Sequence, residues 1–137
     1  MQINAYLVFN GNCEEAFSFY ARCLRAELAM LQRFGDTPGC EGMPAAQRDK
    51  VMHARLQAGN QVLMASDNHP DHPYDGMKGC SIALAVDEPA EAERIFGELA
   101  EGGAVTMPMQ ETFWAKRFGM LTDRFGVPWM VNGGLQS

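Results

Sequence analysis

The sequence lacks the features that mark membrane proteins and nucleic-acid-binding proteins. No apolar run is long enough to span a bilayer, and the chain does not start with a basic segment followed by an apolar one. Lysine and arginine form no run, and the net charge is −6. These absences argue against nucleic acid or an anionic membrane as a partner, and they lead us to expect a cytoplasmic protein.

Cysteine is also scarce, and its spacing does not favour a metal site or a disulfide. The four cysteines include no CxxC pair. A cytosolic chain of 137 residues buries about two-thirds of its unfolded surface and needs no disulfide. We therefore expect one domain covering 1–137, with reduced thiols. Cys40 lies in a polar loop and is the only cysteine that we expect to be accessible.

Two kinds of hydrophobic pattern organise the first half of the chain. Alternating apolar residues predict strands, and an apolar stripe repeating every three to four residues predicts a helix. In order, the pattern gives a strand at 3–9, a helix at about 13–24, a strand at 27–34, a Gly- and Pro-rich loop to 49, and a strand pair at 50–57 and 61–66. A polar linker at 68–78 follows.

After the linker the pattern begins again. It gives a strand around 82–86, a helix that Gly102-Gly103 closes, and strands at 104–109, 116–122 and 128–132. A shift of 76 positions places Glu15-Ala16 on Glu91-Ala92 and Tyr6 on Ile82. The prediction is an α+β protein of two βαβββ modules, at about 1–67 and 79–137, with two four-stranded mixed sheets and helices on their outer faces.

Three segments resemble one known family. They are Phe9-Asn10-Gly11-Asn12-Cys13-Glu14-Glu15-Ala16-Phe17-Ser18-Phe19-Tyr20, Val51-Met52-His53-Ala54-Arg55-Leu56 running on to Met64-Ala65-Ser66-Asp67, and Thr112-Phe113-Trp114 running on through Asp123-Arg124-Phe125-Gly126-Val127-Pro128-Trp129. Together they are similar to the PhnB-like branch of the glyoxalase/bleomycin-resistance/extradiol-dioxygenase (vicinal oxygen chelate) superfamily.

The resemblance implies a paired βαβββ domain, usually a homodimer, with a small-molecule pocket in a concave sheet. It names no reaction, because the superfamily includes metal-dependent lyases and isomerases, ring-cleaving dioxygenases, thiol transferases and drug-binding proteins. Related chains have been labelled as methyltransferases. However, no strand here leads into a Gly-rich, dinucleotide-type loop, and we expect no cofactor.

Metal enzymes of the superfamily take one ligand from the first and last strands of each half. Projected onto this chain, those positions fall on Ala5, Ser81, Met130, and either Met64 or Ala65. None of these side chains is a hard ligand for Zn²⁺, Ni²⁺ or Mn²⁺, so we predict that the protein holds no metal at this site.

The linker offers the other dense set of metal donors. An His-x-x-His spacing there needs a rigid frame that a Pro-broken loop does not provide, so a solvated loop is the preferred interpretation. The donors are Asp67, His69, Asp71, His72 and Asp75.

His53 is the strongest candidate for chemistry. Its neighbours Met52, Ala54 and Leu56 form an apolar face, so strand alternation turns His53 and Arg55 to the opposite face. A neutral imidazole there is suited to act as a general base or to bind a ligand, with Arg55 beside it, while the alternative is a structural histidine with a fixed partner.

Aromatic residues gather in the last third of the chain. We expect Trp114, at a loop-to-strand junction, to line a pocket, and Trp129 to belong to the core. Arg117 lies nearby, and its planar guanidinium is suited to a carboxylate or phosphate, although a solvated arginine is the alternative. Asp67 and Asp123 each end a strand, where aspartate commonly binds the backbone of its own turn.

These observations lead to one hypothesis and two alternatives. The leading hypothesis is a homodimeric protein that binds a small molecule, with His53 as a catalytic or hydrogen-bonding group and Arg55, Trp114 and Arg117 as substrate contacts. The alternatives are a metal-dependent glyoxalase- or dioxygenase-like enzyme and a drug-sequestering binding protein. The sequence does not decide whether a reaction takes place.

Overall fold

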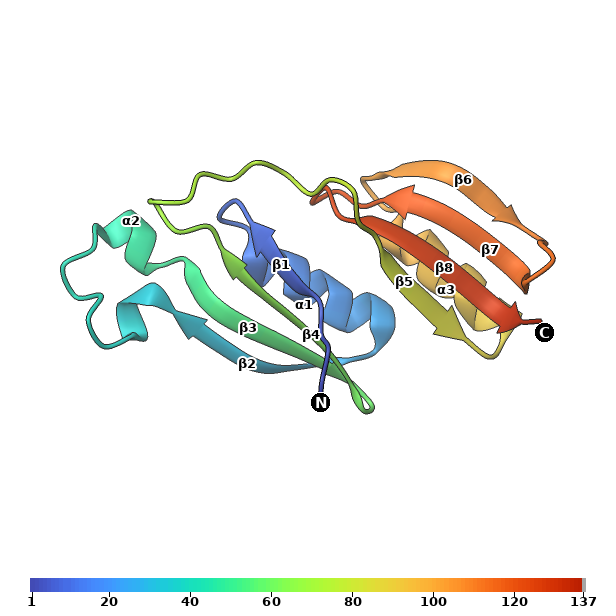
Figure 1. Cartoon of the computed structure of the whole chain (residues 1–137), viewed down its shortest axis with the longest axis horizontal. Helices are drawn as coiled ribbons and strands as arrows, with labels where there is room; N and C mark the ends of the chain where they lie inside the picture. Colours follow the sequence, from blue (N-terminus) through green and yellow to red (C-terminus); the bar gives the residue numbers. More distant parts are fainter. Residues whose placement is uncertain (137) are drawn as a thin grey trace. The chain divides into compact units, whose positions relative to one another are not determined.

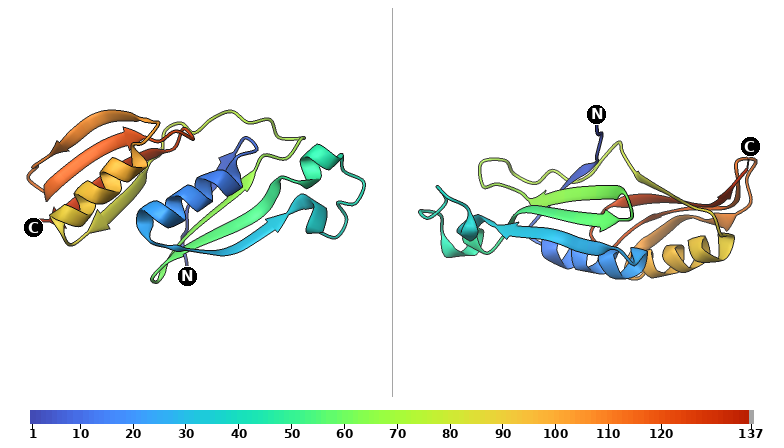
Figure 2. Two further views of the ribbon diagram at one scale, coloured as in Figure 1. Left: turned by 180° about the vertical axis from the view of Figure 1, so that it is seen from behind. Right: turned by 90° about the horizontal axis from the view of Figure 1, so that it is seen from below.

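The computed structural model describes residues 1–136 and divides into two compact units, Met1–Gly76 and a second that begins at Met77 (Figure 1). Each unit contains a four-stranded mixed sheet with a long helix against one face (Figure 2). No helix within these residues has the length and apolar character needed to cross a membrane.

Unit 1 is a βαβββ module with two short helical segments in its long loop. Its sheet has the order β1-β4-β3-β2, with β1 parallel to β4 and the other pairs antiparallel. Its elements are β1 (Tyr6–Phe9), α1 (Cys13–Leu24), β2 (Glu27–Arg33), η1 (Phe34–Asp36), α2 (Ala45–Arg48), β3 (Val51–Ala58) and β4 (Gln61–Asp67).

Helix α1 forms because its apolar residues fall on one side and its ends are held. Ala16, Tyr20 and Cys23 belong to its buried stripe. The Asn12 side chain does not cap the helix; instead Asp67 accepts a hydrogen bond from the Cys13 backbone N–H at 2.9 Å. The carboxylate thus stabilises an otherwise unpaired donor and ties the helix start to the end of β4.

Unit 2 repeats the same order of elements around a second sheet, β5-β8-β7-β6, with β5 parallel to β8. Pro89, which needs no hydrogen-bond acceptor, starts its helix. Its elements are β5 (Ile82–Val86), α3 (Pro89–Leu99), β6 (Ala104–Gln110), β7 (Ala115–Thr122) and β8 (Pro128–Leu135). The predicted α+β class with paired βαβββ modules is confirmed.

Close packing of α3 against its sheet depends on two glycines. A Cβ added at Gly133 would lie 2.5 Å from the Ala92 Cβ, and one added at Gly119 would lie 2.7 Å from Cε2 of Phe96. Both distances are too short for real contacts. At Gly133 the helix itself would have to move, whereas at Gly119 the Phe96 ring would have to shift. Trp129 is 1% exposed and belongs to this core, as predicted.

The predicted shift of 76 holds for the helices but is wrong by one residue for the first strands. Ala16 and Ala92 are both fully buried, in agreement with the shift. In the first strands, however, Leu7 pairs with a buried residue of β4 and Leu84 pairs with a buried residue of β8. These two leucines therefore correspond, and they are 77 positions apart. Three residues join β1 to α1, whereas two join β5 to α3. A one-residue slip moves every strand side chain to the other face, so Tyr6 matches Ala83 and not Ile82.

Other boundaries differ only slightly from prediction. The first strand begins at Tyr6 and not at residue 3. The carbonyl oxygen of Ala5 still accepts a hydrogen bond from the Met64 backbone N–H, but Ile3 is 89% exposed. The loop from 34 to 49 contains η1 and α2, which hydrophobic patterning did not reveal because they are short and polar.

Candidate functional site

The face of the unit 1 sheet that points away from α1 is here called the open face. Alternation along the strands assigns residues to it, since their neighbours Leu7, Ala54 and Ala65 are buried on the helix side. Tyr6, Val8 and Met30 on the open face are 47%, 42% and 38% exposed. Its central residues are Tyr6, Val8, Met30, His53, Arg55 and Met64. The same pairing places Glu27, Gln32, Gln57, Val62 and Ser66 around them on this face.

Tyr6 and His53 form the polar centre of this face. The Tyr6 hydroxyl lies 3.1 Å from Nδ1 of His53, and the two rings stack with their centroids 5.7 Å apart. The pair spans β4, which lies between β1 and β3. In the tautomer that carries its proton on Nε2, the hydroxyl donates to Nδ1 and leaves Nε2–H as a donor for a ligand.

The geometry also bears on the two interpretations of His53. The side chain is partly exposed, and its partner is an exposed hydroxyl and not a buried group. Water can therefore replace either partner, so the pair contributes little to stability. This arrangement favours a role at the surface over a structural role.

Arg55 lies on the same strand as His53, two residues further along. Its cross-strand neighbours are Met30 on β2 and Met64 on β4. The side chain is exposed, and no ion pair or side-chain hydrogen bond involves it within residues 1–136. A cation therefore lies between two flexible apolar side chains.

Unit 2 offers an internal comparison, because its strands pair in the same way. Met64 pairs with Tyr6 and Arg55, and Met130 pairs with Ala83 and Met120. Asp67 follows Met64 by three residues, and Gly133 follows Met130 by three. Each lies against the first residue of the helix of its own unit, which supports the same matching. The matched positions are Tyr6 and Ala83, His53 and Phe118, Arg55 and Met120, and Met30 and Met107.

Trp114 lies immediately before β7 and is half-buried on unit 2. Its Nε1 donates to Oδ1 of Asn132 at 3.0 Å, and its ring contacts Phe118 edge-to-face, with centroids 5.1 Å apart. Phe113 beside it is 88% exposed. The indole is therefore held in place with part of its surface free, but Trp114 and His53 belong to different units.

Arg117 is oriented differently from the other candidates. It pairs with Gly133, which faces α3, and its Nε donates to Oε1 of Glu93 on that helix at 2.6 Å. A second bond joins its Nη2 to the backbone oxygen of Met109 at 3.1 Å. The guanidinium is thus engaged within unit 2, and the ligand role of Arg117 stays a prediction.

The positions projected for the superfamily's metal do not fit one. Ala65 is fully buried on the helix side, and Ala5 and Ser81 lie outside the strands. Among residues 1–136, no three His, Cys, Asp or Glu side chains are grouped as a metal site. In the linker, the His69 and His72 rings lie 6.0 Å apart, and Nδ1 of His69 accepts a bond from the Asp71 backbone N–H. No step of the proposed function involves a metal.

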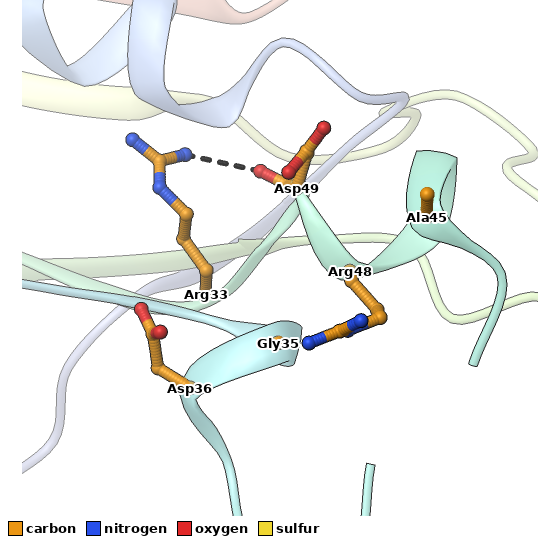
Figure 3. Close-up of a pocket in the computed structure, with 6 residues that line it drawn as sticks. All are labelled: Arg33, Gly35, Asp36, Ala45, Arg48 and Asp49. Carbon is orange, nitrogen blue, oxygen red and sulfur yellow. Dashed lines mark hydrogen bonds between the residues drawn. The ribbon is translucent and has the colours of Figure 1, made fainter. Parts of the chain in front are cut away.

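A charged cavity of about 270 Å³ lies between η1 and α2 (Figure 3). Arg33 is fixed there, because its Nη2 donates to both carboxylate oxygens of Glu14 at 2.9 and 3.0 Å and its Nη1 donates to the Asp49 carbonyl at 3.0 Å. Glu14 raises the pKa of Arg33. The lining is Arg33, Gly35, Asp36, Ala45, Arg48 and Asp49. Two arginines and two aspartates balance in charge, so the lining favours neither an anion nor a cation.

The two strand-ending aspartates play different parts. Asp123 accepts bonds from the backbone N–H groups of Phe125 and Val127, as predicted for its own turn, and also from Nε1 of Trp129 at 2.9 Å. For Asp67 the prediction was wrong. Its carboxylate accepts bonds from the backbone N–H groups of Cys13 and Val51 and so joins three elements.

The cysteines differ in accessibility from the prediction in one respect. Cys13 and Cys23 are buried, Cys40 is partly exposed, and Cys80, just before β5, is exposed as well. Burial raises the pKa of the Cys13 thiol, and the negative charges of Asp67 and Glu14 raise it further. Cys13 therefore stays protonated and unreactive at neutral pH.

Tyr6 is the site residue that the sequence analysis did not single out. A signal was present, since Leu7 and Phe9 are apolar and alternate along the predicted strand at 3–9, which turns Tyr6 to the other face. What the sequence did not supply was the sheet order, which places β1 within reach of β3 across β4.

Comparison with known proteins places this geometry in a family. Residues 2–131 match the family model of the glyoxalase/bleomycin resistance protein/dioxygenase superfamily. The chain belongs to this superfamily.

Individual relatives match over almost the whole chain. Protein YjdN of Escherichia coli (strain K12) is 36% identical over 140 residues, which cover 96% of this chain and 95% of YjdN. The structure of protein PA1353 from Pseudomonas aeruginosa is 60% identical, with a TM-score of 0.89 and 97% of each chain covered. A PhnB protein structure from Bacillus cereus is 26% identical, with a TM-score of 0.80, covering 97% of this chain and 99% of that one.

Proposed function

We propose that the protein binds a small molecule on the open face of unit 1, with the Tyr6–His53 pair as the hydrogen-bonding centre. The observation that carries this proposal is the contrast between the matched positions. Unit 2 has the same strand order with Ala83 and Phe118 where unit 1 has Tyr6 and His53. The fold therefore does not need a tyrosine or a histidine there, and a ligand gives a reason for both.

Exposure supports the same conclusion. Tyr6, Val8 and Met30 present apolar area on a face that also holds a hydrogen-bond donor and acceptor. Ligand sites commonly combine apolar walls with a few polar groups that fix orientation. For unit 2 taken by itself, Trp114 is proposed as a separate ligand contact, because its indole is held by Asn132 with one side partly free.

His53 is suited to two tasks on such a ligand. With Nδ1 bonded to Tyr6, its Nε2 donates to a carbonyl or hydroxyl oxygen of the ligand. If the ligand has an acidic proton, the other tautomer is needed: Nδ1–H donates to the Tyr6 hydroxyl oxygen and the free Nε2 accepts the ligand's proton. Chemical conversion of the bound molecule would indicate a base, and its absence would indicate a hydrogen-bonding group only. Assay of the copurified ligand before and after incubation with the protein measures this conversion.

The first experiment identifies the ligand and tests His53. Native mass spectrometry followed by denaturation gives the mass of any molecule that copurifies with the protein. His53→Ala should weaken its binding about tenfold or more and should lower the free energy of unfolding by less than about 1 kcal/mol, because the lost bond is exposed. Tyr6→Phe should weaken binding less, since it keeps the ring and removes only the hydroxyl.

The matched control is His72→Ala, which removes an exposed imidazole from the linker. It should leave both affinity and stability unchanged. A His53→Ala variant with unchanged ligand affinity and a strongly lowered denaturant midpoint would show that His53 is structural, and the proposal would be wrong.

Metal content and oligomeric state complete the proposal. We propose that the untagged protein, loaded with Zn²⁺, Ni²⁺ or Mn²⁺ and dialysed, retains much less than one metal ion per chain, since Ala5, Ser81 and Met130 cannot ligate one. We also propose a homodimer, tested by sedimentation equilibrium. Near one equivalent of metal, or a clean monomer mass, would contradict the respective statement.

A further inference from the structure

Arg55 is the one permanent cation among the six central residues of the open face of unit 1; Glu27 shares the face, opposite Gln57, and forms no ion pair with Arg55. The cross-strand neighbours of Arg55 are both methionines, Met30 and Met64. A thioether cannot neutralise a guanidinium, so neither neighbour offsets its charge.

Three of the other arginines on strands and helices form ion pairs with acidic residues, whereas Arg22 on α1 and Arg48 on α2 form none within residues 1–136. Arg33 binds Glu14, Arg94 binds Glu91 and Glu98, and Arg117 binds Glu93. Arg55 has no such partner within residues 1–136. The five donors of its guanidinium are therefore directed only to solvent in the unliganded protein.

The fold does not require a cation at this place. The matched position in unit 2 is Met120, which pairs with Met107 and Met130. Unit 2 thus has three methionines in a row across the sheet, and unit 1 has methionine, arginine and methionine. Replacing the central methionine by arginine adds a planar pair of donors and keeps the apolar surroundings.

We propose that the open face of unit 1 selects small molecules that carry a carboxylate beside an apolar body. This assignment rests on the function proposed above. Arg55 binds the carboxylate through two parallel N–H···O bonds, the geometry in which guanidinium and carboxylate match. Met30 and Met64 contact the apolar body, to which their flexible side chains adapt.

The test uses pairs of probes that differ only in charge. Aliphatic and aromatic carboxylates, each paired with its own carboxamide, are titrated into the full-length ¹⁵N-labelled protein, and the backbone amide signals of strands β1 to β4 report the site and the affinity. The carboxylate of a pair should bind about tenfold or more tightly than its carboxamide, because the carboxamide is uncharged and offers the guanidinium one oxygen where the carboxylate offers two.

Three variants locate the charge that causes this preference. Arg55→Gln should abolish the difference between carboxylate and carboxamide, and Arg55→Lys should keep part of it, since lysine retains the charge without the fork. Arg48→Gln is the matched control, because it removes another exposed arginine of unit 1, from the charged cavity. It should preserve the full preference.

The outcomes separate this inference from the function on which it rests. If carboxylates and carboxamides both bind on the open face with equal affinity, the inference about Arg55 is wrong and the proposed function stands. If Arg48→Gln removes the preference and Arg55→Gln does not, the anion binds in the charged cavity and the inference is again wrong. If no probe shifts the signals of the open face, both proposals are contradicted.

Discussion

The two units of this protein have the same scaffold and different surfaces. Both have a βαβββ order, a helix on one face and a parallel first pair of strands. On the face away from the helix, unit 1 has Tyr6, His53 and Arg55, and unit 2 has Ala83, Phe118 and Met120 at the matched positions. At these three matched positions, unit 1 therefore has polar or titratable groups and unit 2 has apolar ones.

The aromatic residues of unit 2 show what becomes of the face when those groups are missing. Trp114 lies over Phe118, which is only 3% exposed although it points away from α3. In unit 1 the matched His53 stays partly exposed and is bonded to Tyr6. One face is therefore partly closed by its own side chains, while the other remains available to a ligand.

The largest effect on stability is expected at the two buried aspartates, which hold the helix side of each unit. Asp123→Ala leaves two backbone donors and the Trp129 indole unpaired, and should lower the free energy of unfolding by about 3 kcal/mol or more. Asp67→Ala leaves two donors unpaired and should cost about 2 kcal/mol or more. Urea midpoints at constant m-value measure both, and losses below about 0.5 kcal/mol would contradict these roles.

Alkaline pH is expected to have an intermediate effect on the free energy of unfolding, through Cys13 of unit 1. Its helix starts at the buried thiol Cys13, whereas α3 starts at Pro89. Folding raises the pKa of Cys13 above its ordinary value of 9.0, so the folded state keeps a proton that the unfolded state loses. This contribution to stability is complete below about pH 9 and falls by about 1.4 kcal/mol per unit above it.

The comparison with Cys13→Ala isolates this contribution from other groups that titrate in the same range. Between about pH 8 and about pH 10, the wild type should lose at least about 1 kcal/mol more stability than the variant. Denaturant midpoints across this range provide the measurement. Equal losses in the two proteins would mean that Cys13 ionises as readily in the folded state as in the unfolded one.

The smallest effect on stability is expected at Trp114. Trp114→Phe keeps a ring over Phe118 and removes the bond to Asn132, which should cost about 1 kcal/mol. Because Trp129 is buried in the core, the change in tryptophan fluorescence on ligand binding should come from Trp114 and should disappear in the variant. A fluorescence change that persists in Trp114→Phe would remove Trp114 from the proposed ligand contacts.

Hydrophobic periodicity was enough to predict the fold. The helix at 13–24 was predicted from an apolar stripe, which is buried in the structure, and the strand that follows begins at 27 as expected. The one-residue error between the first strands arose because a strand pattern has no internal mark of its register. That register is fixed by pairing with a distant strand, β4 or β8, which local spacing does not encode.

The candidate site was predictable only in part for the same reason. Alternation along β3 was enough to indicate that His53 and Arg55 share a face. It was not enough to reveal Tyr6, which is 47 positions away in sequence and separated from β3 by another strand. Nor did it show that the Arg117 guanidinium binds Glu93, because that ion pair depends on the placement of α3 on its sheet.

The most direct test of the central claim gives unit 1 the open-face residues of unit 2. The variant combines Tyr6→Ala, His53→Phe and Arg55→Met, and it is compared with the wild type by urea unfolding and by titration with the copurifying ligand or the best carboxylate probe. We expect a folded protein whose free energy of unfolding lies within about 1 kcal/mol of the wild type, since unit 2 tolerates these residues, and a loss of ligand binding of about a hundredfold or more. An unfolded variant, or a folded one that binds the ligand as tightly as the wild type, would contradict the claim that these three residues are present for a ligand and not for the fold.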